Sequence, residues 1–221
     1  MTILENIKEH PSLKQMAFRA IKEAIINNKL RPGEIYTEQK LAKELGVSKT
    51  PVREALLDLG LKGFVNYLPR KGFQISLLTE KEIHNLYVVR RALETAALQT
   101  GLSKLTAQDI IQIETIHERE EGAIKTNDRH AYMRIDRELH YNIAKLSENG
   151  YLINSLENIR DLVDWMGFMA LSRQGRIVEA REEHHRIIEK IKDRDLDGAI
   201  QSMELHSQLT EQNVLQMLQK S

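Results

Sequence analysis

Nearly unbroken helical periodicity from Thr79 to the end of the chain limits the possible folds more than any other feature of the sequence. About six helical segments are expected there, at approximately residues 80–101, 106–122, 127–148, 151–171, 177–192 and 196–219. Thr79 with Glu82 and Thr106 with Asp109 have the spacing of capping boxes. Because strand-like alternation of useful length does not occur in this part of the sequence, it predicts an all-α bundle.

The first 76 residues show a different pattern. Apolar residues at i, i+4 spacing predict an amphipathic helix over 12–28, and a short helix follows from Thr37 to Leu45. The segment 46–48, Gly-Val-Ser, is typical of the turn between two helices that meet at a steep angle, and Pro51 suits the first turn of the next helix. Two β-like stretches, 64–68 and 72–76, flank a basic turn at 69–71.

These patterns together predict a mainly α protein of two domains. Residues 1–76 are expected to form a winged helix-turn-helix, and residues 77–221 an all-helical bundle of about six helices. The chain is neutral overall, with 32 basic and 32 acidic residues. Residues 1–76 hold 13 basic and 8 acidic residues, which leaves 19 and 24 for the remainder. The neutral total therefore combines a basic front with an acidic rear.

Several classes of protein are excluded or disfavoured by composition. The chain has no cysteine, which excludes disulfides, thiolate zinc sites and cysteine nucleophiles. No apolar run approaches the roughly 20 residues of a membrane span, and the N-terminal residues do not have the pattern of a signal peptide. We therefore expect a cytoplasmic protein without a membrane partner.

The exposed positions of the predicted recognition helix and wing are basic. A helix N-terminus offers N–H groups to phosphate, and Arg or Lys can reach guanine edges. A small protein-interaction domain is the alternative use of two helices and a hairpin. The run TEQKLAKELGVSKTPVREALLDLGLKGFV resembles the DNA-reading signature of the GntR family of bacterial transcription regulators. The resemblance implies double-stranded operator DNA as partner, contacted at Gln39, Ser48, Lys49, Thr50, Arg53 and Gly72, with Arg70 and Lys71 beside Gly72.

Two of these positions depart from the family pattern. Family members often have Arg where this chain has Gln39 and Lys49. Lys cannot form the planar two-pronged contact of Arg, so the base preference at that contact is left open.

Histidines are the informative residues of the rear domain. Asp136 and His140 are spaced i, i+4 and leave one helix face together. His184 or His185 on the fifth helix and His206 on the sixth can reach the same point if those helices pack antiparallel. Three imidazoles and one carboxylate suit a divalent ion such as Zn²⁺, Ni²⁺ or Mn²⁺.

A second resemblance covers this half of the chain. The runs VVRRALETAAL, DRELHYNIAKLSENGYL and EHHRIIEKIKDRDLDGAIQSMELH resemble the FCD effector domain of FadR-type GntR regulators. Members with a metal site use one Asp and three His, and the matching positions are Asp136, His140, His185 and His206. His185 is chosen over His184 because His-Arg followed by apolar residues is the family pattern.

The same resemblance implies a small organic acid as effector. Arg90 and Asn149 match the positions expected to bind it, and Arg91 is the alternative to Arg90. The chain is therefore expected to be a homodimeric, metabolite-responsive repressor and not an enzyme. The alternatives are a metal-dependent hydrolase, because a metal with an open position can activate water, and a constitutive regulator with a structural metal.

Overall fold

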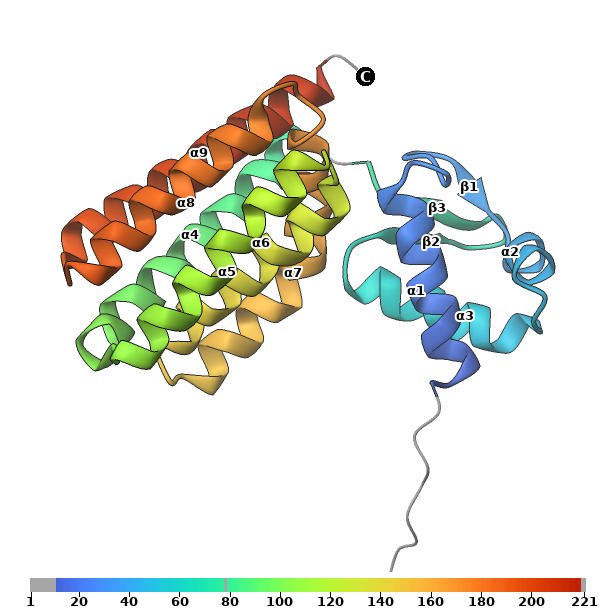
Figure 1. Cartoon of the computed structure of the whole chain (residues 1–221). Helices are drawn as coiled ribbons and strands as arrows, with labels where there is room; N and C mark the ends of the chain where they lie inside the picture. The colour runs from blue at the N-terminus through green and yellow to red at the C-terminus, as the bar shows by residue number, and fades with distance from the viewer. Residues whose placement is uncertain (1–10, 78, 220–221) are drawn as a thin grey trace, which may run out of the picture. The chain divides into compact units, whose positions relative to one another are not determined.

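The computed structural model describes residues 11–77 and 79–219 and divides into two compact units after residue 78, close to the boundary expected at 76. The first unit contains three helices and three short strands (Figure 1). In chain order these are α1 (Leu13–Ile26), β1 (Ile35–Tyr36), α2 (Glu38–Leu45), α3 (Lys49–Leu61), β2 (Val65–Leu68) and β3 (Gly72–Ile75). This is the predicted winged helix-turn-helix.

Local sequence signals set the turn between α2 and α3. Gly46 ends α2 with a φ of 66°, a left-handed conformation that costs glycine little. Ser48 is the N-cap of α3. The buried stripe of α3 packs against α1, and its members are less than 1% exposed: Val52, Ala55, Leu56 and Leu59. This packing leaves the N-terminal turn of α3 at the surface.

The sheet has the order β1-β3-β2, with both pairs antiparallel. Sequence periodicity did not predict β1, because a two-residue strand is too short to show alternation. Gly72 is required where β1 meets β3. It has a φ of 125°, and a Cβ at this position would lie 2.5 Å from the carbonyl oxygen of Tyr36. The close approach of the strands therefore excludes any larger residue.

The second unit confirms the prediction of six α-helices in the rear domain. Their bounds are α4 (Glu80–Gly101), α5 (Ala107–Lys125), α6 (Arg129–Lys145), α7 (Gly150–Ala170), α8 (Arg176–Lys192) and α9 (Leu196–Leu218), with a 3-10 turn η1 (Leu102–Lys104) after α4. Thr79 and Thr106 form the predicted capping boxes, and Asp195 caps α9. The expected helix end at Gly122 was wrong, since α5 continues to Lys125.

The helices of the second unit pack around a large apolar core. α9 lies along both α4 and α8, while α6 packs against α5 and α7 (Figure 1). The core includes Leu98, Ile113, Leu139, Ile143, Ile187, Ile188 and Met203. This arrangement turns one face each of α4, α6, α8 and α9 toward a common interior, where the polar residues described below are buried.

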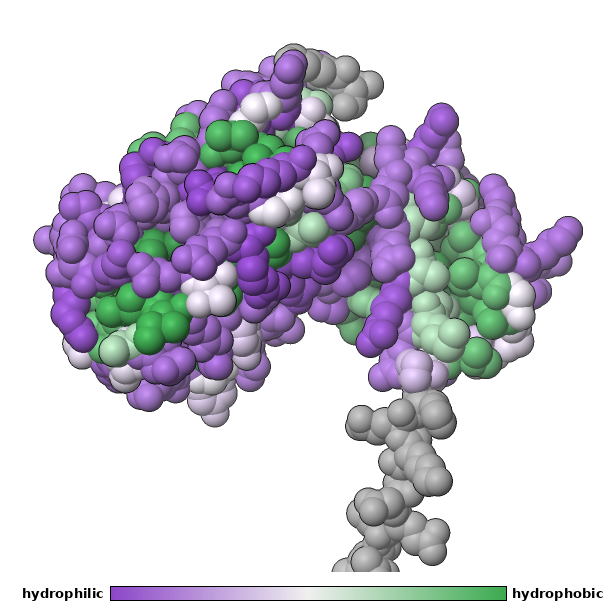
Figure 2. Space-filling model, in the orientation of Figure 1, coloured by the Kyte–Doolittle hydropathy of each residue, from purple (hydrophilic) through white to green (hydrophobic). Residues whose placement is uncertain are grey.

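The surface is mostly hydrophilic, with small hydrophobic patches on both units (Figure 2). Single apolar side chains such as Leu61 and Ile111 are 90% and 55% exposed, as is normal for a protein surface. Among the helices that the structure describes, none is long and apolar enough to span a membrane.

Two glycines of the helical unit give a matched test of this packing. A Cβ on Gly101 would lie 2.4 Å from the carbonyl carbon of Leu146, while a Cβ on Gly122 would meet nothing within 4 Å. We expect Gly101→Ala to lower the free energy of unfolding by about 3 kcal/mol. Gly122→Ala should raise it by ~0.5–1 kcal/mol, because alanine is the better helix former. Urea unfolding of both variants, monitored by circular dichroism, measures the two changes in the free energy of unfolding. Changes of the same sign would contradict this packing.

Candidate DNA-binding surface and candidate metal centre

The residues predicted to contact DNA occupy three places on the first unit. Gln39 lies in the first turn of α2; Ser48, Lys49, Thr50 and Arg53 lie at the N-terminus of α3; Arg70 and Lys71 lie in the turn between β2 and β3. All seven are exposed, and Gly72 is half-buried. Ser48 makes no capping hydrogen bond through its side chain, so its hydroxyl is available to a phosphate. A role in DNA binding stays a prediction for each of them.

Four buried side chains of the second unit converge on one point. Asp136 and His140 come from α6, His184 from α8 and His206 from α9. One potential ligand atom from each lies within 4.8 Å of all the others. The four residues are 8%, 3%, 0% and 2% exposed, in that order. One carboxylate and three imidazoles at this distance form a set that could hold a divalent metal ion.

Each histidine of the cluster is held by its own glutamate. The Nδ1 atom of His140 lies 2.8 Å from Glu94, that of His184 lies 2.6 Å from Glu120, and that of His206 lies 2.8 Å from Glu183. A carboxylate accepts the Nδ1 proton, which leaves Nε2 as the atom able to bind a cation.

The Nε2 atoms, on the other side of each imidazole ring from Nδ1, give an independent indication of a metal site. Nε2 of His206 is buried without a hydrogen-bond partner, and Nε2 of His184 lies 3.4 Å from Oδ1 of Asp136. Nε2 of His140 accepts a hydrogen bond from Arg90 at 3.1 Å. Buried polar atoms are rarely left unpaired, so the unpartnered nitrogen of His206 fits a metal ion as the missing partner.

Asp136 in the cluster and Glu183 beside it stay ionised although they are buried. Burial favours the neutral form of Asp136, but the neighbouring histidines and Arg160 hold the pKa of Asp136 well below its usual range. Burial is likewise outweighed at Glu183, where His206 and Arg176 lower the pKa to about 2. Negative charge is therefore present at the cluster at neutral pH.

The imidazoles differ in charge. Burial lowers the pKa of His140, and burial with the nearby positive groups lowers the pKa of His206 to about 3. For His184 burial is outweighed by Glu120 and Asp136, which raise its pKa to about 10. Two imidazoles are thus ready to bind a cation, and the third must first lose a proton.

Three buried arginines complete the polar interior. Arg90 pairs with Glu94 at 3.0 Å, and Arg160 with Asp136 at 2.8 Å. Arg176 donates to Glu183 at 2.6 Å and to the hydroxyl of Thr210 at 3.0 Å. These side chains are 3%, 5% and 1% exposed, so each charge is compensated inside the protein.

Comparison with known proteins identifies both units. Residues 13–75 match the model of bacterial regulatory proteins of the gntR family, and residues 85–209 match the FCD domain. This chain belongs to the GntR family. It is a DNA-binding transcription regulator with an FCD domain, and its family and relatives, which are transcription regulators, decide against the metal-dependent hydrolase.

Individual GntR-family relatives resemble the whole chain. An uncharacterised HTH-type transcriptional regulator of Bacillus subtilis, YdhC, is 30% identical over 190 residues, which cover 86% of this chain and 85% of the relative. The gluconate operon transcriptional repressor of Bacillus licheniformis is 31% identical over 182 residues, which cover 78% and 73%. The solved structure of Escherichia coli McbR/YncC has the same fold, with a TM-score of 0.75 at 22% identity and coverage of 95% and 98%.

The structure of this GntR regulator corrects the choice between its two adjacent histidines. His185, assigned to the metal set from the sequence, is exposed and stacks on His117, with ring centroids 5.7 Å apart. His184 takes the place in the cluster. The signal was present in the sequence, because His184 stands four residues after Ala180 and three before Ile187 on the buried stripe of α8.

The two residues predicted to bind the effector have different surroundings. Arg90 is buried beside the cluster, while Arg91 pairs with Glu211 at 2.5 Å on another side of α4. Asn149 is exposed and caps α7, where its side chain accepts hydrogen bonds from the N–H groups of Tyr151 and Leu152. The structure thus gives Asn149 a capping role and places it outside the cavity described next.

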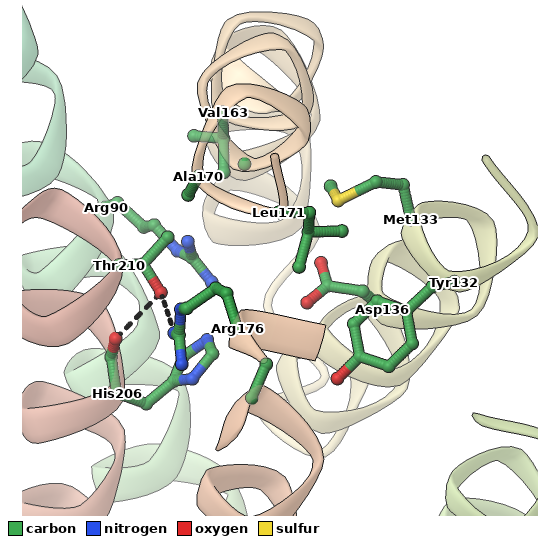
Figure 3. A pocket seen from close by; sticks show the side chains of 12 residues that line it. Arg90, Tyr132, Met133, Asp136, Val163, Ala170, Leu171, Arg176, His206 and Thr210 are labelled. Carbon is green, nitrogen blue, oxygen red and sulfur yellow. Dashed lines mark hydrogen bonds between the residues drawn. The ribbon is translucent and has the colours of Figure 1, made fainter. Parts of the chain in front are cut away.

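A small cavity adjoins the cluster (Figure 3). Its polar residues include Arg90, Asp136, Arg176, His206 and Thr210. Tyr132 also lines it, and the rest of its wall is formed by Met133 of α6, Val163, Gly167 and Ala170 of α7, Leu171 after α7, and Ala180 of α8. The cavity therefore touches two members of the candidate metal set and two of the buried arginines.

The residues that support the cluster were not predicted from the sequence. They are Glu94, Glu120, Glu183, Arg160 and Arg176, all at most 5% exposed. Charged residues at stripe positions are the available signal: Glu183 stands three residues after Ala180 and four before Ile187. Which carboxylate would hold which imidazole depends on how separate helices pack, and periodicity does not contain that information.

The adjacent histidines of α8 give a matched test of the candidate metal centre. We expect His184→Ala to lose most of the metal that copurifies with the protein, and His185→Ala to keep it. The reason is that, of the two histidines, only His184 offers a ligand atom to the cluster. Elemental analysis of protein purified without chelator measures the metal content per chain. Equal metal content in the two variants, or loss only in His185→Ala, would contradict the assignment.

Proposed function

We propose that this regulator is a homodimeric repressor of the cytoplasm whose FCD domain binds one divalent metal ion and a small carboxylic acid. The observation that carries the proposal is the cluster of Asp136, His140, His184 and His206, in which a glutamate orients each imidazole. Orientation by carboxylates is typical of histidines that bind metal. The set suits Zn²⁺, Ni²⁺ or Mn²⁺.

The bound ion would supply a Lewis-acidic position for an effector carboxylate. The chain's own residues would do the rest. Arg90 and Arg176 line the adjoining cavity, and each is paired with a buried glutamate. Nε of Arg176 is buried without a hydrogen-bond partner, so its N–H group could donate to an effector carboxylate.

Operator recognition would use the two DNA-binding domains of one dimer. A single DNA-binding domain makes few contacts, and a two-fold symmetric protein matches a pseudo-palindromic operator. The two DNA-binding domains would have more than one arrangement. The acid would alter the affinity for DNA only if its own affinity differs between those arrangements. The name of the Bacillus licheniformis relative supports repression as the direction of control.

Arg53 provides a direct test of the DNA-binding surface. Its side chain is 63% exposed in α3, and we expect it to contact a base edge. Arg53→Ala should weaken binding to the specific operator by ~1–3 kcal/mol. Lys29→Ala is the control, because it removes the same charge from an exposed position beyond the end of α1. Electrophoretic mobility shifts on the gene's upstream region would refute this role if both variants lost affinity equally.

The sensing role is tested with the same DNA. The zinc-saturated protein should bind the upstream region tightly, and one or more members of a panel of small carboxylic acids should weaken that binding. Protein treated with a chelator should lose its response to the acid, because part of the site is gone. If metal is present and no acid changes DNA affinity or melting temperature, the metal is structural and the regulator is constitutive.

A further inference from the structure

Each glutamate that orients a histidine of the cluster has a second partner. For Glu94 and Glu183 this partner is an arginine, which donates to both carboxylate oxygens at distances of 2.6–3.1 Å. For Glu120 it is His117, whose Nδ1 atom lies 2.8 Å from Oε2 of the glutamate. Glu120 is therefore shared between two imidazoles, that of His184 inside the cluster and that of His117 outside it.

The carboxylate of Glu120 accepts a hydrogen bond on each of its oxygens. Burial favours its neutral form, but His184 and His117 hold the pKa of Glu120 below its usual range. An ionised carboxylate has no proton to donate, so the Nδ1 atoms of both rings are the donors. Oε1 accepts from His184 at 2.6 Å and Oε2 from His117 at 2.8 Å. The orientation of the carboxylate thus depends on both imidazoles.

The phase of α5 brings His117 and Glu120 to the same place. The buried stripe of α5 recurs every three or four residues and consists of Ile113, Ile116, His117, Glu120 and Ala123. This helix packs against α8, which carries His184. His117 lies at the edge of the buried region, since it is 8% exposed and its ring stacks on that of the exposed His185. His117 therefore connects Glu120 with the surface of α5 and α8.

Loss of the His117 N–H group would remove the donor to Oε2 of Glu120. Glu120 is 0% exposed, and a buried carboxylate that loses a donor is destabilised. Its carboxylate would turn toward another donor and weaken its hydrogen bond to Nδ1 of His184. That hydrogen bond holds the His184 ring with its Nε2 atom 3.4 Å from Oδ1 of Asp136. A change at His117 would therefore reach the cluster through Glu120.

We propose that His117 is a positioning residue of the candidate metal centre: it holds Glu120, and Glu120 in turn holds His184 in the orientation that binds the ion. This inference rests on the proposed metal-binding function and names a residue outside the cluster that sets the affinity of the site. Two of the three supporting glutamates are fixed by buried arginines, and the third is fixed from the surface of α5 and α8 by His117.

Leucine and asparagine in place of His117 form a matched pair, because they have similar size and asparagine has an N–H donor two bonds from Cβ, as His117 has at Nδ1. His117→Leu should raise the Kd for Zn²⁺ about 10-fold, near the lower limit for partners of metal ligands, because His117 acts one hydrogen bond further away. His117→Asn should keep the Kd of the unaltered protein. Competition with a chromophoric chelator measures the Kd of the full-length protein. His130→Leu is the control, since it removes an exposed histidine of α6 and should leave the Kd unchanged.

A double-mutant cycle tests whether His117 acts through Glu120. Glu120→Gln alone should raise the Kd for Zn²⁺ by ~10–100-fold. His117→Leu added to Glu120→Gln should raise it little further, because residues that act through one path are not additive. The visible absorption of Co²⁺ bound in place of Zn²⁺ should change in His117→Leu and be restored in His117→Asn. A residue that only stabilises the fold would change the free energy of unfolding of the metal-free protein and leave the Kd and the Co²⁺ spectrum unchanged.

The outcomes separate this inference from the metal centre itself. An unchanged Kd in His117→Leu, an equal loss of affinity in His117→Asn, or additive effects in the double variant overturns the role of His117 and leaves the metal centre in place. Failure of the unaltered protein to bind Zn²⁺, Ni²⁺ or Mn²⁺ overturns the metal centre and this inference with it. Weaker binding in His117→Leu, rescue in His117→Asn and non-additivity with Glu120→Gln support the assignment.

Discussion

The helical domain depends on pairing the charges that it buries. Four carboxylates and three arginines surround three imidazoles in its interior, and an unpaired ion there would cost several kcal/mol. All six helices, α4 to α9, contribute a charged or imidazole side chain to this set. A helix that shifted would leave a buried charge without its partner. The polar centre therefore helps to fix the relative positions of the helices, and it holds one ligand atom of each of the three imidazoles near a common point.

Sequence periodicity was sufficient for the fold, because each helix carries its own buried stripe and its own cap. The i, i+4 pair Asp136 and His140 was recognisable for the same reason, since one helix holds both residues. The sequence pattern was insufficient where a choice depended on helix phase or on contacts between helices. His185 was chosen by local resemblance, although the phase of α8 favours His184. Asn149 caps α7, and its assignment to the effector stays a prediction.

The two domains divide the chemistry between them. The first domain has exposed basic residues that phosphate groups can reach. Its affinity for DNA should therefore depend on salt. The second domain buries a set of paired charges around its histidines. Communication between them must be reciprocal: if an acid weakens operator binding by some factor, the operator weakens binding of the acid by the same factor. The neutral net charge of the chain conceals this division.

The central claim is that one divalent ion is bound by a carboxylate oxygen of Asp136 and by the ring nitrogens that the glutamates leave free on His140, His184 and His206. Anomalous diffraction at the zinc absorption edge, from crystals of zinc-saturated protein, tests it most directly. The account predicts one strong peak per chain, at about 2.0–2.1 Å from Nε2 of each of the three histidines. A peak bound to His185, or no peak among these four side chains, would contradict it.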